Sequence, residues 1–132
     1  MSISYLAHGH PRYARGGGEL AAYRLFEAIR TRVGFEETGL LAAIPDQSFL
    51  PSGCEIMGLE RNEWLISRSQ NPLLHDSTIQ LTQNAHSAVY EALRSSQFQL
   101  IHAHHYVHIG LDLLIALKVW FPSCPLVLTL HE

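Results

Sequence analysis

Four histidines stand in one short segment, LIHAHHYVHIG, which spans residues 100–110. An imidazole side chain can ligate a metal, transfer a proton near neutral pH or orient a substrate by hydrogen bonds. A second segment, HGHPRYARGGGE, spans residues 8–19 and combines two histidines, two arginines and three adjacent glycines. These two segments hold the residue types best suited to chemistry.

The three glycines, Gly16, Gly17 and Gly18, can adopt positive φ and let a ligand approach the main chain closely. We expect a helix to begin there, and the first N–H groups of a helix favour an anion. Arg12 and Arg15 would reinforce that preference. The alternative is a tight strand-to-helix turn without a ligand. The segment has neither the G-x-G-x-x-G spacing of dinucleotide sites nor the Lys-Ser/Thr pair of P-loops.

A metal site needs three or four ligands in the right places. On a strand, His102 and His104 would share one face, and a third ligand could come from His8 or His10. Only the first pair is fixed by spacing, so we predict no metal site.

The H-x-H-x-D-H signature of metallo-β-lactamase-like hydrolases is incomplete, because Tyr106 and Val107 stand at its last two positions. For the remaining histidines we favour hydrogen-bonded or solvent-facing side chains: His75, His86, His102 and His108. A metal-dependent hydrolase therefore stays a minor alternative, and no cofactor is predicted.

Short apolar runs alternate with helical patterns along the chain. The predicted strands are Ile3–Ala7, Gly39–Ile44, a third strand within residues 46–75 (short runs at Glu55–Leu59 and Trp64–Ser67), Phe98–His102 and Leu126–Leu130. The predicted helices are Glu19–Val33, a helix capped by Asp76 or Ser77 that runs to residue 97, and Ile109–Phe121.

This alternation predicts an α/β fold, a doubly wound parallel sheet with helices on both faces. With the common strand order 3-2-1-4-5, the winding reverses between the first and fourth strands, and such folds bind ligands there. The two unusual segments follow those two strands. We therefore expect residues 8–19 and 102–108 to meet at one edge of the sheet.

Composition indicates one globular domain over residues 1–132, with 47% hydrophobic and 16% charged residues. The net charge of −3 predicts no nucleic-acid-binding surface. Two distant cysteines form no disulfide framework, and the first residues do not read as a signal peptide. The longest apolar run, Leu111–Phe121, is interrupted by Asp112 and Lys118. We predict a soluble, cytoplasmic protein.

The succession GGGE, FQLIHAHHY and PLVLTLHE resembles the N-terminal domain of the family 4 retaining glycosyltransferases, which have two Rossmann-like domains in the GT-B arrangement. In that family the first motif usually reads Gly-Gly-Ala-Glu, so Gly18 replaces an alanine. The second, Asp-x-x-His-x-His, places histidines at His102 and His104, with Gln99 at the aspartate position. The third, Thr-x-His-Asp/Glu, falls on Thr129, His131 and Glu132.

The resemblance implies a hexosyltransferase-type enzyme that moves a sugar from a nucleotide-sugar donor to an acceptor with retention of configuration. It implies that His104 is the catalytic contact beside the donor sugar and that the glycine backbone faces the reaction centre or the phosphates. The expected substrate-binding residues are Arg15, Gly16, Gly17, Gly18, Glu19, His105, His131 and Glu132.

Family members carry the nucleotide on a C-terminal domain with an E-x7-E motif, and this chain is expected to lack it, being truncated after strand five. The E-x7-E interval also occurs in two pairs of this chain, which we attribute to coincidence: Glu19 with Glu27, and Glu55 with Glu63. We therefore expect the isolated chain to bind nucleotide-sugar weakly and to have little or no activity. An exposed fifth strand would also favour self-association.

Two further functions stay open: a non-catalytic binding or interaction module, and the hydrolase above. The acceptor is not identified by the sequence. Residues 46–75, in which Trp64, Leu65 and Ile66 lie near Arg61 and Arg68, are a candidate acceptor or peripheral membrane region. The alternative is a loop whose apolar residues are buried in the core.

Overall fold

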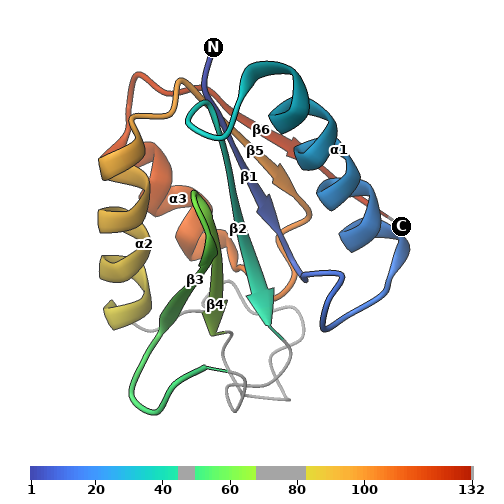
Figure 1. The fold of residues 1–132 in the computed structure, drawn as a ribbon. Coiled ribbons are helices and arrows are strands. Elements are labelled where there is room, and N and C mark those ends of the chain that lie inside the picture. The colour runs from blue at the N-terminus through green and yellow to red at the C-terminus, as the bar shows by residue number, and fades with distance from the viewer. Residues whose placement is uncertain (45–49, 68–82, 132) are drawn as a thin grey trace.

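The computed structural model describes residues 1–44, 50–67 and 83–131 (Figure 1). In chain order the elements are β1 (Ile3–Ala7), α1 (Gly17–Val33), β2 (Thr38–Ile44), β3 (Ile56–Glu60), β4 (Glu63–Ser67), α2 (Gln83–Ser96), β5 (Leu100–His104), α3 (Leu111–Trp120) and β6 (Leu126–Thr129).

The strands form one six-stranded sheet in the order β3-β4-β2-β1-β5-β6. All neighbours are parallel except β3 and β4, which form an antiparallel hairpin. The predicted order of the parallel strands is confirmed. The prediction of a wholly parallel sheet is wrong, because the two short runs in residues 46–75 pair with each other through the turn at Arg61 and Asn62, where Asn62 has φ 58°.

Helices cover both faces of the sheet, as the doubly wound prediction requires (Figure 1). On one face, Ala22 and Phe26 of α1 pack against Tyr5 of β1 and Leu40 of β2. On the other face, the apolar sides of α2 and α3 pack against Leu6, Leu41 and Ala103, among others. Neighbouring strand residues alternate between the two cores, which gives the central strands their continuous apolar sequence.

The strand before the histidine segment begins two residues later than predicted and carries through His104. Gln97 has φ 50°, and the N–H groups of Gln99 and Leu100 both donate to Ser2 O before the β1–β5 ladder begins. The helix predicted from Ile109 begins at Leu111, because Gly110 has φ 92°. The predicted cap at residues 76–77 lies outside the described residues.

Leu65 and Ile66 are buried in β4, so these two side chains belong to the core rather than to a surface for acceptor or membrane. Within the described part of the chain, no helix is both long and apolar enough to cross a bilayer.

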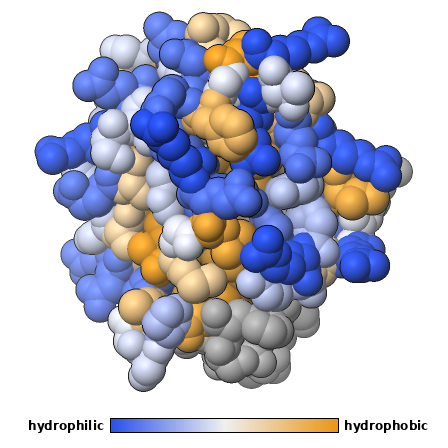
Figure 2. All heavy atoms as spheres, in the orientation of Figure 1, coloured by the Kyte–Doolittle hydropathy of each residue, from blue (hydrophilic) through white to orange (hydrophobic). Residues whose placement is uncertain are grey.

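The edge strand β6 leaves apolar side chains in solvent. Val127 and Leu128 of β6 are exposed, and Leu130, the residue that follows the strand, retains 64% of its surface. On the face in Figure 2, by contrast, hydrophilic side chains predominate and the apolar ones form smaller areas between them. An unpaired parallel edge with apolar side chains is a template for pairing with another chain.

We therefore predict concentration-dependent self-association through β6. Leu130→Lys should shift the molar mass measured by light scattering toward that of one chain, because a lysine at a strand edge opposes pairing. The matched control is Val33→Lys, which changes an exposed apolar residue at the end of α1. A wild-type protein that stays monomeric at millimolar concentration would contradict the prediction.

Candidate functional site

Parallel pairing brings the carboxyl ends of β1, β5 and β6 together at one edge of the sheet. Ala7 pairs with His104, and His104 pairs with Thr129. The chain therefore leaves the three strands side by side, and His8, His105 and His131 follow closely on these paired positions. The predicted meeting of the two histidine-bearing segments is confirmed.

His104 is the most deeply buried histidine ring of this group, with 5% of its surface exposed. Its Nδ1 lies 3.2 Å from Nε2 of His131, and the two rings stack at an interplanar angle of 16°. The ring of His102 is 4.3 Å away between centroids, and Nε2 of His102 bonds to the hydroxyl of Thr129 at 2.8 Å. His102 is thus a hydrogen-bonded strand residue, as expected.

The Nε2 atom of His104 is buried and has no hydrogen-bond partner among the described residues. Buried polar atoms are nearly always paired, so an unpaired one calls for an explanation. The rings of His102, His131 and Tyr5 surround the ring of His104, with centroid distances of 4.3, 5.4 and 6.2 Å.

The pKa of His104 is lowered to about 4 by burial and then by three neighbouring histidines, His102, His131 and His8. Burial disfavours the charged ring, and charged neighbours would repel it. The side chain is therefore neutral at neutral pH. In that state it donates one hydrogen bond and accepts one, and it is not a proton donor of imidazolium type.

His8 contacts two hydrogen-bond acceptors. Its Nδ1 lies 3.2 Å from the carbonyl oxygen of His104, and its Nε2 lies 3.3 Å from Oε1 of Glu19. The ring of His8 thus connects the end of β5 to the first turn of α1. Glu19 lies in the first turn of α1, where a carboxylate is also favoured by the helix dipole.

The glycines at the start of α1 have different surroundings. A Cβ at Gly18 would lie 2.7 Å from Cε1 of His8 and 3.5 Å from Cδ2 of His131, whereas a Cβ at Gly17 would meet nothing within 4 Å. Gly16 is the N-cap residue and provides no side-chain cap. Gly18 thus makes room for the histidine rings.

His105 lies just beyond β5 with φ 67°, in the left-handed region. Its Nδ1 accepts hydrogen bonds from the N–H groups of Tyr106 and Val107, so its proton is on Nε2. Burial and then the charge of His8 lower the pKa of His105. The ring is 5.5 Å from that of His8 between centroids and completes the cluster.

The predicted catalytic residue His104 lies together with most of the predicted substrate-binding residues: Gly16, Gly17, Gly18, Glu19, His105 and His131. Arg15 has an exposed side chain and forms no ion pair with a described residue. Glu132 lies outside the described residues. The importance of His8 was missed, because its spacing in the sequence suggested only a third metal ligand.

In the described ranges, no group of three or more His, Cys, Asp or Glu side chains is arranged to hold a metal ion. No protein-family model matches the sequence, and no curated protein matches it. The glycosyltransferase resemblance therefore stays a prediction drawn from three motifs.

We predict that the protein loses stability in acid because of His104. The unfolded ring binds a proton near its ordinary pKa of 6.5, whereas the folded ring stays neutral down to about 4. Protonation in this window therefore favours the unfolded state, so the free energy of unfolding falls as the pH drops from 6.5 to about 4, by up to about 3 kcal/mol. Urea unfolding of wild type and His104→Gln should show a flatter pH dependence for the variant, and equal slopes would contradict the assignment.

We predict opposite effects of alanine at two adjacent glycines. Gly18→Ala should lower the free energy of unfolding by about 1–3 kcal/mol, because the new methyl group overpacks the ring of His8. The control Gly17→Ala should be neutral or stabilising, since its site is open and alanine favours a helix. Chemical unfolding measures both, and a tolerated Gly18→Ala would show that the histidine can shift without cost.

Proposed function

We propose that this chain forms one wall of a retaining glycosyltransferase active site, in which the histidine cluster contacts the sugar of a nucleoside diphosphate sugar. The main support is the buried, unpartnered Nε2 of His104 at the carboxyl edge of the sheet. This edge lies where the winding reverses between β1 and β5, the usual ligand position in doubly wound folds.

A sugar hydroxyl suits the chemistry of His104. The bond between Nδ1 of His104 and Nε2 of His131 can hold its proton on either nitrogen, so Nε2 of His104 is left as an acceptor in one case and as a donor in the other. A hydroxyl group can donate or accept and satisfies both forms, whereas a phosphate oxygen satisfies only the second. In this proposal His131 moves aside when the sugar enters.

The start of α1 suits the diphosphate. Its N-cap residue, Gly16, offers no side chain to the first N–H groups, and the backbone at Gly17 is exposed. The N–H groups at the positive end of a 17-residue helix attract anionic oxygens, and the Glu19 carboxylate already lies against Gly16 there. The Glu19 carboxylate lies 3.3 Å from Nε2 of His8, a contact that is an ion pair when His8 is protonated.

The proposed reaction breaks the bond between the anomeric carbon and the phosphate oxygen and forms a bond from that carbon to the acceptor oxygen. The acceptor's proton leaves with the diphosphate. Neutral hydrogen-bonding groups in fixed positions stabilise the charge that develops on the sugar, without an acidic side chain. The role proposed for His104 is therefore contact and orientation.

One observation favours a second candidate, a non-catalytic binding module: His104 is closed off from solvent in this structure, with 5% of its surface exposed. A module that has lost the chemistry would keep this arrangement when nucleotide-sugar is added.

Isothermal titration with UDP-glucose, GDP-mannose and ADP-glucose tests the proposal, with and without a donor-type domain of a family 4 glycosyltransferase supplied in trans. We expect weak binding by the chain alone and tighter binding with the second domain. His104→Ala should weaken that binding roughly tenfold or more, because it removes a hydrogen bond to the sugar.

The matched control is His86→Ala, a histidine of α2 that pairs with Asp112. It should bind as wild type. An absence of binding in every combination, or equal effects of the two substitutions, would contradict the proposed transferase and favour the interaction module.

A further inference from the structure

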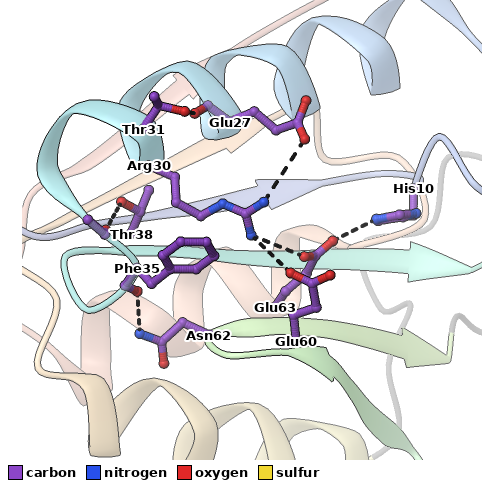
Figure 3. A network of polar contacts seen from close by, with 10 residues as sticks. His10, Glu27, Arg30, Thr31, Phe35, Thr38, Glu60, Asn62 and Glu63 are labelled. Carbon is purple, nitrogen blue, oxygen red and sulfur yellow. Dashed lines mark hydrogen bonds and ion pairs between the residues drawn. The ribbon is translucent and has the colours of Figure 1, made fainter.

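We propose that His10 is a positioning residue for this site: its hydrogen bond to the buried carboxylate of Glu63 fixes the loop between β1 and α1 and thereby places His8 and Glu19. The inference rests on the proposed function for the ligand that the site serves. The contacts that carry it lie outside the histidine cluster, in a polar network on the α1 face of the sheet (Figure 3).

His10 and Glu63 form a buried pair that joins two distant parts of the chain. Nε2 of His10 lies 2.9 Å from Oε1 of Glu63, and each side chain is only 4% exposed. Nδ1 of His10 accepts the N–H of Arg12 at 3.1 Å. Since Nδ1 is an acceptor, the proton of the ring is on Nε2, and it is donated to the carboxylate.

Glu63 is itself held in place from the opposite side. Its Oε2 lies 3.5 Å from Nη1 of Arg30, which extends from α1 (Figure 3). The guanidinium group of Arg30 is 4.6 Å from the ring centroids of both Phe26 and Phe35. The two aromatic rings hold the guanidinium group of Arg30 in place. The carboxylate of Glu63, which accepts the hydrogen bond from His10, therefore has a defined position.

His10 also organises the loop that follows it. Its carbonyl oxygen accepts the N–H groups of Tyr13 and Ala14, both at 2.9 Å. Together with the bond to Arg12, three N–H groups of the next four residues bond to His10. The ring also packs edge-on against Tyr23 of α1 at 5.0 Å between centroids. The turn from residue 10 to residue 14 thus depends on where this one side chain is anchored.

Gly9 connects this anchor to the site. A Cβ at Gly9 would lie 2.6 Å from Cγ of Glu19, so the main chain between His8 and His10 runs directly against the Glu19 side chain. His8, one residue earlier, makes the ion pair with Glu19. A displacement of His10 therefore moves Gly9, and with it His8 and the Glu19 side chain beside the start of α1.

A buried polar pair such as His10 and Glu63 is an unusual way to attach a loop to a sheet. A buried carboxylate such as that of Glu63 is often less stabilising than an apolar residue of equal volume, but its hydrogen bond from His10 defines one geometry. An apolar pair would hold the loop to the sheet without fixing its direction. We infer that the His10–Glu63 bond serves the geometry of the site more than the stability of the fold.

Two substitutions of His10 each keep one of the two hydrogen bonds of its ring and remove the other. In His10→Gln the amide nitrogen takes the place of Nε2 and can still donate to Glu63, but the acceptor for Arg12 N is lost. In His10→Asn the amide oxygen takes the place of Nδ1 and can still accept from Arg12 N, but it cannot reach Glu63. The control is Glu60→Gln, which removes an exposed carboxylate from the same Arg30 and has no contact with the loop.

Binding of UDP-glucose, GDP-mannose and ADP-glucose is measured by titration under the conditions that give wild-type binding, and amide and imidazole NMR spectra are recorded for each variant. His10→Asn should weaken binding about 10- to 100-fold and shift the signals of His8, Gly16 and Gly18, because small displacements of positioning groups are costly. His10→Gln should restore most of the affinity. Glu60→Gln should leave both readouts at wild-type values.

The inference is overturned if His10→Asn leaves the signals of His8, Gly16 and Gly18 in place, or if His10→Gln loses as much affinity as His10→Asn. Wild-type protein that binds none of the three nucleotide-sugars would count against the proposed function alone. The NMR comparison would still decide whether His10 places the loop. Thermal unfolding of each variant confirms that the compared proteins are folded.

Discussion

The parallel pairing of β1 with β5 and of β5 with β6 is the constraint on which the site depends. Ala7, His104 and Thr129 lie at the same level across the three strands, so the residues that follow them leave the sheet together. The register of the strands also determines toward which face of the sheet each side chain points. A slip of one residue would turn His102 and His104 toward α2 and α3 and put Ala103 under α1, because side chains alternate along a strand. The histidine cluster exists only in the observed register.

Much of this arrangement follows from local patterns in the sequence. The alternation of apolar runs with helical stripes predicted the parallel strand order, and the order alone placed residues 8–19 beside residues 102–108. The spacing of His102 and His104 also gave their common face correctly. The run Glu55–Leu59, which becomes β3, was recognised as a short strand-like run, but its antiparallel pairing with β4 was not predicted, because short runs without strong periodicity do not reveal their pairing partner.

The parts of the site that could not be predicted are long-range side-chain contacts. Glu63 lies in a short run of mixed residues, and nothing in the sequence shows that it is buried against His10, 53 positions away. The stacking of His131 on His104 and the pairing of His8 with Glu19 likewise depend on three-dimensional placement. The cluster thus holds a buried His104 whose lowered pKa keeps it neutral, and a neutral ring suits hydrogen bonding better than proton transfer.

The most direct test of a sugar-binding histidine cluster is a titration followed by NMR of the histidine rings, in which UDP-glucose, GDP-mannose or ADP-glucose is added together with the donor-type domain. The account predicts that the ring signals of His8, His104 and His131 shift with a common midpoint, while the signal of His86 on α2 stays in place. Saturating nucleotide-sugar that leaves the three site histidines unchanged, or that moves His86 to the same extent, would contradict it.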